Sequence, residues 1–404
     1  MRPMNEADEE PPIIYTPPSR LSKSTRAISF VIFMLALLAR AACLKQLQGS
    51  PLWGEMPADV AFHVDWAKRL AAGDWIGTGV FGQGPLYAYF LGLVFKVLGT
   101  GLLAPRLIQI VVGAATCVLI QRIGRQAFSP LTGLVAGLTA AVYAPFLLHD
   151  VMLGGELFAV FFICAVVYQL LAADGSQRGL LATAGVCLGL AALVRDALIL
   201  LAPVTALWLM IDPWLRGKMT GGRAREGLGR VGALAIGLML VVVPVAVRNY
   251  NVSGETVLLT TGGAEIVRTA DSAMPVSRRL LVFLNRQELP DHLDYLRHRS
   301  QLPILRLPLP TWGWAAPAAL AGLILSLTRW REALILYLIG GGYIATALLF
   351  NLGGYRMPVV PLMILFAGYG VVEIATAVAR RRFVRAALGA VALLAGIAIV
   401  NLSL

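Results

Sequence analysis

Two acidic stretches of the chain border apolar runs and hold the residues best suited to acid–base chemistry. The first has helical spacing, which predicts an amphipathic helix with one stripe formed by Asp59, Phe62, His63 and Trp66. A carboxylate that faces a cavity at Asp59 would act as a general base, whereas a carboxylate in a first helical turn also suits an N-cap. Asp59 and His63 are four residues apart and could also bracket a metal ion.

The second acidic stretch runs from His149 and Asp150 to Glu156. Glu156 directly precedes an apolar run, and an ionisable group at the edge of the hydrocarbon layer is costly unless it faces a polar cavity or water. Glu156 is therefore either a cavity carboxylate or an interfacial one that is wetted near the lipid headgroups.

The composition of the chain predicts a lipid environment for the elements that position these residues. Of its 404 residues 58% are hydrophobic and 14% are charged, and the mean hydropathy is +0.75. Soluble domains are closer to half apolar and a quarter charged. The net charge of +12 comes from short clusters between apolar runs, which set membrane orientation and do not indicate nucleic acid. We therefore predict an all-α, multi-pass protein of the plasma (inner) membrane.

Apolar runs of about 16 residues or more predict eleven transmembrane helices. They cover residues 27–44, 102–121, 129–148, 155–173, 179–194, 197–213, 230–247, 312–328, 333–351, 357–379 and 386–404. The tail 1–26 is polar, with five prolines, and is predicted to be disordered and cytoplasmic. Residues 27–404 form one membrane domain whose inner loops then carry the basic clusters.

Two polar segments face outward in this topology. The first is 45–84, which continues through a short apolar stretch, 85–100, that holds Lys96 and is predicted to lie in the interface. Together they make an outer loop, 45–101, with amphipathic juxtamembrane helices. The second, 248–305, alternates in charge and is either a lid or acceptor-facing segment or a solvated connector.

Three arginines, Arg195, Arg248 and Arg356, stand at the outer ends of spans and so oppose the positive-inside trend. A planar guanidinium near the outer leaflet suits a phosphate headgroup. The alternatives are snorkelling or a local ion pair, such as Arg195 with Asp196. Three such arginines beside two acidic stretches favour an anionic lipid ligand.

Together these residues make the chain resemble the GT-C class of membrane glycosyltransferases, which includes protein O-mannosyltransferases and the lipid A aminoarabinose transferase. The resemblance rests on four stretches in order: Asp59 with its helix, Gly73-Asp74-Trp75, Gly84-Pro85-Leu86-Tyr87 and Arg106; Asp150 to Glu156; Gly189 to Arg195; and Pro244 to Tyr250 with Gly262-Gly263 and Tyr355 to Pro361. It implies a sugar donor on an undecaprenyl- or dolichyl-type phosphate, and a lipid, glycan or protein acceptor in or at the membrane.

The resemblance also implies site residues. A catalytic carboxylate in the first outer loop falls on Asp59. Relatives often have Asp-Glu there, whereas this chain has Asp59-Val60, so the role of the second acid passes to Asp150 or Glu156. The implied donor-phosphate ligands are Arg195, Arg248, Arg356 and Tyr355, and the implied cavity residues are His63, His149 and Tyr87. A divalent cation is the one cofactor left open.

Two other functions stay open on the residues alone. The missing second acid after Asp59 also suits a non-catalytic protein that binds a polyprenyl phosphate. A transporter of lipid or sugar is the other, although such proteins usually show paired halves and charged or broken helices at mid-membrane. The ionisable residues concentrate instead at one face, which favours transfer over passage.

Overall fold

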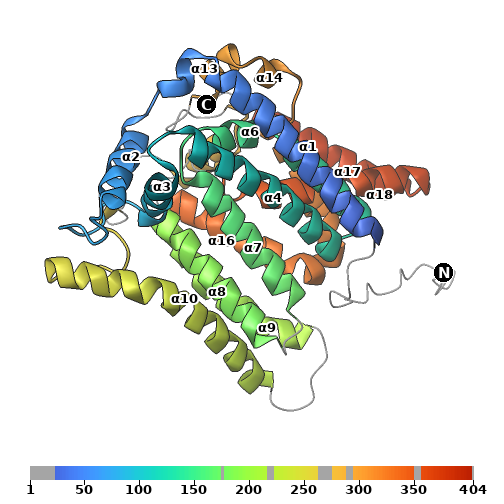
Figure 1. The fold of residues 1–404 in the computed structure, drawn as a ribbon. Coiled ribbons are helices and arrows are strands. Elements are labelled where there is room, and N and C mark those ends of the chain that lie inside the picture. The colour runs from blue at the N-terminus through green and yellow to red at the C-terminus, as the bar shows by residue number, and fades with distance from the viewer. Residues whose placement is uncertain are drawn as a thin grey trace.

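The computed structural model describes residues 23–173, 177–215, 223–262, 275–287, 294–349 and 356–402 of the chain. Every regular element within these ranges is a helix (Figure 1). The predicted all-α class is therefore confirmed. The first helix begins at Lys23, four residues before the predicted start of the first span, and the rest of the predicted tail lies outside the described residues.

Each predicted apolar run falls on one helix or on two helices separated by a short break. The bundle consists of α1 (Lys23–Gln48), α4 (Leu103–Ala127), α5 (Pro130–Ala141), α6 (Ala144–Val151), α7 (Glu156–Ala172), α8 (Arg178–Val194), η3 (Asp196–Leu200), α9 (Leu201–Leu215), α10 (Arg223–Ser253), α15 (Trp312–Ser326), η4 (Leu327–Arg329), α16 (Trp330–Leu349), α17 (Val360–Ala379) and α18 (Phe383–Val400).

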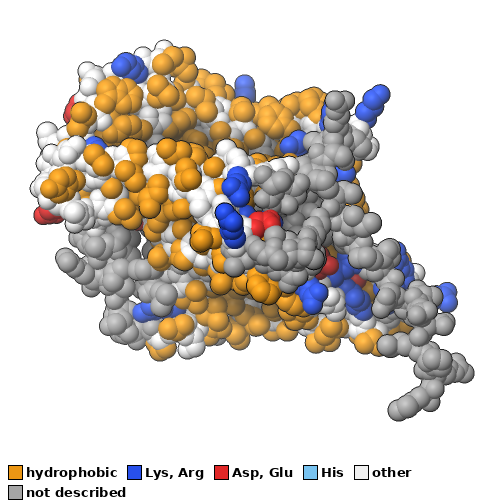
Figure 2. Space-filling view, turned by 90° about the horizontal axis from the view of Figure 1, so that it is seen from below, with side chains coloured by type: hydrophobic (Ala, Val, Ile, Leu, Met, Phe, Trp, Pro, Cys, Tyr) orange, Lys and Arg blue, Asp and Glu red, His pale blue; other side chains and the backbone are white. Residues whose placement is uncertain are grey.

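Length and apolarity support fewer crossings than the eleven predicted spans. In the described ranges six helical segments are long and apolar enough to cross a membrane, namely α1, α4, η3 with α9, α10, α17 and α18. The pair α5–α6, bent by 53°, would make a seventh. Hydrophobic side chains cover most of the described surface on the face seen in Figure 2, as contact with lipid requires.

Small residues let the helices of the bundle approach closely. In lipid the hydrophobic effect does not drive helices together, so such close packing holds them instead. A Cβ added at Gly322 of α15 would overlap the carbonyl oxygen of Phe366 in α17. In the same way, Gly237 of α10 lies against the backbone of Ala182 in α8. These two glycines fix the α15–α17 and α8–α10 contacts.

Substitution of Gly322 by alanine is expected to lower the free energy of unfolding of the detergent-solubilised protein by about 1–3 kcal/mol, because the new methyl group overpacks the α15–α17 contact. The unfolding temperature should fall accordingly. Gly341 of α16 is the matched control, since a Cβ there meets no atom within 4 Å. Gly341→Ala should leave the unfolding temperature unchanged or raise it. Equal unfolding temperatures for the two variants would contradict this packing.

Shorter helices cover one end of the bundle. In the first polar loop these are η2 (Pro51–Gly54), α2 (Ala58–Ala71) and α3 (Pro85–Leu98). The amphipathic helix predicted there is confirmed, because Val60, Val64, Ala67 and Leu70 are buried in α2, which packs on α3. With 14 residues, α3 is about 21 Å long, shorter than the ~30 Å hydrocarbon layer.

The described part of the second polar loop forms α12 (Val276–Leu284), α13 (Tyr295–Gln301) and α14 (Pro303–Arg306). Leu302 and Leu305 are fully buried and pack with residues of α1 and α6. Residues 295–306 are therefore packed onto the bundle, which a plain solvated connector would not be. Their role as a lid or acceptor-facing segment stays a prediction.

The turns between helices gather at two ends of the bundle (Figure 1). We name the end that holds the first polar loop, the α6–α7 turn and the break after Val194 the site end. At the opposite end, the far end, Thr25 bonds to Arg125, and Phe128 stacks on Tyr369 with 4.4 Å between ring centroids. The α15–α16 and α17–α18 turns also lie at the far end.

Candidate active site

Three backbone segments meet at the site end because two of them carry glycine. A Cβ at Gly84 would overlap the carbonyl oxygen of Val194, and one at Gly155 would lie 3.0 Å from Val194 Cγ1 and 3.5 Å from Tyr87 Cβ. These contacts bring the first turns of α3 and α7 against the last residue of α8. The Gly84-Pro85 step of the sequence is thus needed for close approach of the backbone.

Tyr87 is the centre of this contact, at 1% exposure. Its hydroxyl donates to Gln109 Oε1 at 3.1 Å and accepts from the Gly154 N–H at 2.9 Å. Gln109 in turn donates to the Met152 carbonyl oxygen at 2.7 Å, so α3, α4 and the α6–α7 turn are joined. Burial raises the pKa of the Tyr87 hydroxyl well above its usual range, which keeps it a neutral donor.

Glu156 and Arg195 form an ion pair beside Tyr87. The distance from Arg195 Nη2 to Glu156 Oε1 is 2.6 Å, and the two side chains are 18% and 20% exposed. His149 lies close enough to Glu156 to act on it electrostatically. Asp196, which the sequence offered as a local partner of Arg195, accepts a hydrogen bond from the Thr260 hydroxyl. A guanidinium paired with a carboxylate at a partly exposed position suits a phosphate ligand.

Asp59 reaches the same place from α2. The N-cap residue of α2 is Pro57, so Asp59 lies inside the first turn rather than at the capping position, and it is partly exposed. Asp59 and Glu156 both lie close enough to Tyr87 to act on its hydroxyl electrostatically. The His63 ring, one turn further along α2, meets the Tyr87 ring edge-on with 5.6 Å between centroids.

Val60 shows where the second acid of the relatives would lie. Its side chain is 4% exposed and belongs to a buried cluster with Tyr87 and Leu153. Leu153 stands three residues before Glu156. Position 60 therefore belongs to the same buried cluster as the α6–α7 turn, and the transfer of the second acid's role to Glu156 stays a prediction.

Arg248 of α10 holds the first polar loop. Its guanidinium lies 3.9 Å over the Phe81 ring and donates to the carbonyl oxygens of Ile76 and Gly79, the latter at 2.7 Å. Phe81 packs on Trp66 of α2, with 5.1 Å between ring centroids. Arg248 is thus linked through two aromatic rings to the helix that carries Asp59.

The Asp150 side chain is buried inside the bundle, while the Asp150 carbonyl oxygen accepts a 3.5 Å hydrogen bond from Gln109. Asp150 Oδ2 is 2.6 Å from Arg40 Nε of α1, and the Arg40 and Asp150 side chains are only 1% and 6% exposed. Arg40 also donates to the carbonyl oxygens of Ala36 and Ala141, and a Cβ at Gly113 would overlap the Asp150 carboxylate. The pair with Arg40 gives Asp150 a role in packing, and the catalytic role implied by the resemblance stays a prediction.

Arg356 is also buried, at 3% exposure, at the end of α12. It donates to the carbonyl oxygens of Val282, Asn285 and Gln287 at 2.8, 2.9 and 3.1 Å. These bonds close the last turn of α12, so the predicted phosphate role of Arg356 stays a prediction. Tyr355, its neighbour in the predicted ligand set, lies outside the described residues.

Arg106 of α4 is a cation that the predicted site did not include. It is 1% exposed, stacks on the Trp53 ring at 4.0 Å and donates one bond, of 3.1 Å, to the Trp53 carbonyl oxygen. Its Nε and Nη1 find no hydrogen-bond partner in the described part of the chain, and it acts electrostatically on Tyr87. The sequence could have marked Arg106 as a candidate site residue, because an arginine at the start of an apolar run is costly unless it has a partner or a function.

Metal ligands are sparse in this arrangement. The described residues contain no group of three or more His, Cys, Asp or Glu side chains that could hold a metal ion. Asp59 and His63 offer two ligands on one face of α2, and a divalent cation there would need further ligands from substrate or water.

Comparison with known proteins gives a family match over part of the chain and several solved structures of similar fold. Residues 82–247 match the family model for dolichyl-phosphate-mannose-protein mannosyltransferase, a stretch that includes Tyr87, Glu156 and Arg195. No curated protein sequence matches the chain.

Among solved structures, ArnT from Cupriavidus metallidurans bound to undecaprenyl phosphate matches with a TM-score of 0.55 at 15% identity, over 85% of this chain and 59% of that one. The Archaeoglobus fulgidus oligosaccharyltransferase complex with Zn and sulfate matches with a TM-score of 0.55 at 14% identity, over 92% and 51%. The archaeal oligosaccharyltransferase AglB from Archaeoglobus fulgidus, with an inhibitory peptide and a dolichol-phosphate, matches with a TM-score of 0.52 at 15% identity, over 94% and 55%.

The chain spans between about half and three fifths of the length of these three proteins. The likeness extends over most of this chain, and the family match covers the helices on which Tyr87, Glu156 and Arg195 stand. The chain therefore shares the fold of ArnT and of the archaeal oligosaccharyltransferase, and part of it resembles the dolichyl-phosphate-mannose-protein mannosyltransferase family.

Proposed function

We propose that this chain moves a sugar from a polyprenyl-phosphate donor to a lipid, glycan or protein acceptor at the outer face of the plasma (inner) membrane. One observation carries the proposal: the Glu156–Arg195 ion pair and the helix that carries Asp59 meet at Tyr87, on whose hydroxyl both Asp59 and Glu156 act electrostatically. ArnT, whose fold the chain shares, was solved with undecaprenyl phosphate, and AglB with a dolichol-phosphate. The same lipid class is the donor proposed here.

Asp59 serves as the general base in this mechanism. An acceptor hydroxyl is a weak nucleophile at neutral pH, and a carboxylate within hydrogen-bond reach takes its proton as its oxygen attacks the anomeric carbon of the sugar. The bond from that carbon to the phosphate oxygen breaks, and the lipid phosphate leaves. Asp59 suits this step because it is partly exposed at the start of α2.

Arg195 stabilises the leaving phosphate. Charge develops on the phosphate oxygens as the sugar leaves, and a preorganised guanidinium lowers the energy of that transition state. Glu156 orients Arg195 through their 2.6 Å contact. In this mechanism Glu156 takes the role of the second carboxylate that relatives often carry at the position of Val60. Arg248 and the buried Arg106 add positive potential from α10 and α4.

The orientation follows from the charges at the two ends. The far end carries Arg329 in η4 and Arg331 in the first turn of α16, and Arg380 to Arg382 between α17 and α18. By the positive-inside rule these turns, and the start of α1 at the same end, face the cytoplasm. The site end then faces outward, where a polyprenyl-phosphate sugar would meet its acceptor.

Binding of undecaprenyl phosphate to the purified chain in nanodiscs tests the proposal. Arg195→Gln is expected to weaken binding about tenfold or more, because a charge-assisted contact to phosphate is lost. Glu156→Gln should bind at least as tightly as the parent, since it releases the Arg195 guanidinium for the phosphate. Arg331→Gln, which removes a cation stacked on Trp330 at the far end, is the matched control.

Equal affinity of the parent and Arg195→Gln would contradict the proposed phosphate site. Binding without sugar transfer to any of a panel of acceptors would instead indicate a non-catalytic lipid-binding protein. Flux of lipid or sugar across liposomes without a donor would indicate a transporter.

A further inference from the structure

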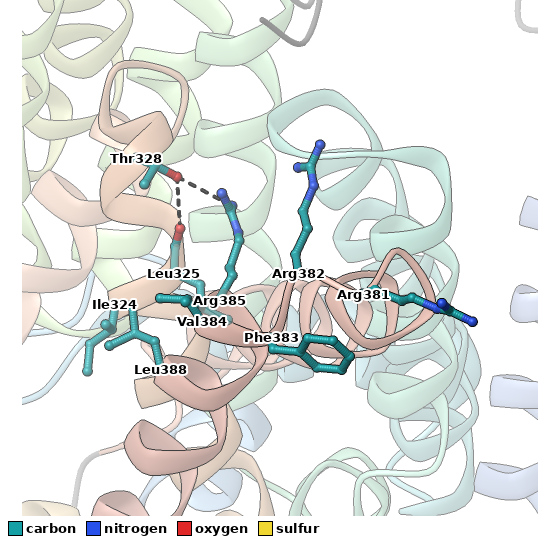
Figure 3. A pocket seen from close by; sticks show the side chains of 9 residues that line it. All are labelled: Ile324, Leu325, Thr328, Arg381, Arg382, Phe383, Val384, Arg385 and Leu388. Atoms are coloured by element: carbon teal, nitrogen blue, oxygen red, sulfur yellow. Dashed lines mark hydrogen bonds between the residues drawn. The ribbon is translucent and has the colours of Figure 1, made fainter. Parts of the chain in front are cut away.

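A groove of about 550 Å³ opens at the far end of the bundle, between the α15–α16 turn and the α17–α18 turn. Its size is that of sites that hold small molecules. Figure 3 shows Arg382 and Arg385 side by side on one wall, with Thr328 facing Arg385. The groove lies at the other end of the bundle from Asp59 and is not part of the candidate active site.

The polar side of the groove is strongly basic. Arg381, Arg382 and Arg385 line it, and none of the described residues that line it is acidic. Glu373 of α17 holds Arg385 through a 2.6 Å contact, and Arg385 Nη2 also lies 3.4 Å from the hydroxyl oxygens of Thr328 and Tyr369. Arg385 is thereby fixed in place, and the groove keeps a net positive charge that suits an anion.

The backbone holds the three arginines in a fixed turn. Arg381 has φ of +57°, a left-handed conformation that residues other than glycine rarely adopt. The Arg381 N–H bonds to Val378 O and the Arg382 N–H to Ala377 O, at 3.0 and 2.8 Å, which closes the end of α17. Glycine is the common residue at such a helix end, so an arginine there points to a use for its charge.

The other side of the groove is apolar and exposed. Phe383 and Val384, in the first turn of α18, are 69% and 88% exposed, and Leu388 one turn further is 50% exposed. α18 is one of the helices apolar and long enough to cross the membrane, so these side chains suit contact with acyl chains. A site with guanidinium groups above an apolar wall matches a phospholipid, which has a phosphate above two acyl chains.

We propose that this groove binds an anionic phospholipid of the leaflet at the far end of the bundle. The headgroup phosphate accepts bonds from Arg382 and Arg385, with Arg381 at the rim, and the acyl chains lie along α18. Basic pockets between transmembrane helices are the usual form of such sites. This proposal does not depend on the transferase activity of the opposite end.

Native mass spectrometry of the full chain with phosphatidylglycerol or phosphatidylcholine tests it. The parent is expected to retain phosphatidylglycerol in preference, and Arg381→Gln/Arg382→Gln to lower its affinity about tenfold or more. Arg225→Gln/Arg331→Gln removes the same charge from the first turns of α10 and α16, outside the groove, and should bind like the parent. Thr328→Glu, which places a carboxylate beside Arg385, should lose phosphatidylglycerol as the first double variant does.

Two outcomes would overturn the proposal. One is an equal loss of phosphatidylglycerol in both double variants, which would mean that surface charge alone attracts the lipid. The other is equal retention of the two lipids by the parent. If the Arg381/Arg382 double variant does not fold, Thr328→Glu decides alone: unchanged phosphatidylglycerol affinity in that variant counts against the groove.

Discussion

Asp59→Asn is expected to leave the chain folded and inserted in the membrane while sugar transfer from a polyprenyl-phosphate donor falls by about 10²–10⁴-fold. The size of the loss follows from the usual contribution of a general base, since the amide keeps the shape of the side chain but cannot accept the proton. Transfer would be measured as labelled sugar that moves from the lipid donor to acceptors in membranes.

Asp65→Asn is the matched control for this prediction. Asp65 stands on the same helix, is exposed, and pairs with Lys68 at 2.9 Å, away from Tyr87. Its amide variant should transfer sugar at close to the parent rate. Full activity in Asp59→Asn would remove the proposed mechanism, whatever the control shows.

Asp150→Ala is expected to destabilise the protein by about 3–5 kcal/mol, because it leaves the Arg40 guanidinium buried without its carboxylate. The pair joins α1 to α6, and both side chains are almost fully enclosed, at 1% and 6% exposure. The measurement is the unfolding temperature and the yield of folded protein in detergent. Arg40→Ala should be milder, because the uncharged form of Asp150 is easier to bury.

The double variant Arg40→Met/Asp150→Leu separates packing from catalysis. Replacing a buried ion pair by apolar residues of similar volume is often neutral or stabilising, so this variant should fold. If Asp150 acts only in packing, the double variant also transfers sugar. A double variant that folds but does not transfer sugar would support a catalytic role for Asp150.

The positions of the helices could be predicted because apolar runs report membrane helices directly. The break between α5 and α6 was not predicted, because 129–148 reads as one apolar run. Pro145, in the first turn of α6, is the residue in the sequence that could have indicated it. The first amphipathic helix was predictable for a similar reason, as its buried side repeats with helical spacing.

Pairings between charged residues were harder to predict, since nothing in the sequence links residues distant along the chain. Arg40 and Asp150 are 110 positions apart, and Glu156 and Arg195 are 39 apart. Local proximity favoured Arg195 with Asp196, whereas the ends of α7 and α8 bring Arg195 to Glu156. Arg40, an arginine inside the apolar span 27–44, was a sign of a buried partner.

The three outer arginines are used in different ways. Arg195 faces Glu156, Arg248 holds the 76–81 loop, and Arg356 closes α12. Arg195 contacts Glu156, and Arg248 is connected to α2 through aromatic rings, so the gathering of charged groups at one phosphate site stays a prediction. Arg106, placed in the motif but not in the predicted site, lies next to Tyr87.

A structure of the chain in nanodiscs with bound polyprenyl phosphate tests the central claim most directly. We expect the phosphate at the site end, within hydrogen-bond distance of Arg195, with the Asp59 carboxylate facing the open side of the same cavity. A phosphate held away from Arg195, for instance only in the groove between Arg382 and Arg385 at the far end, would contradict the account.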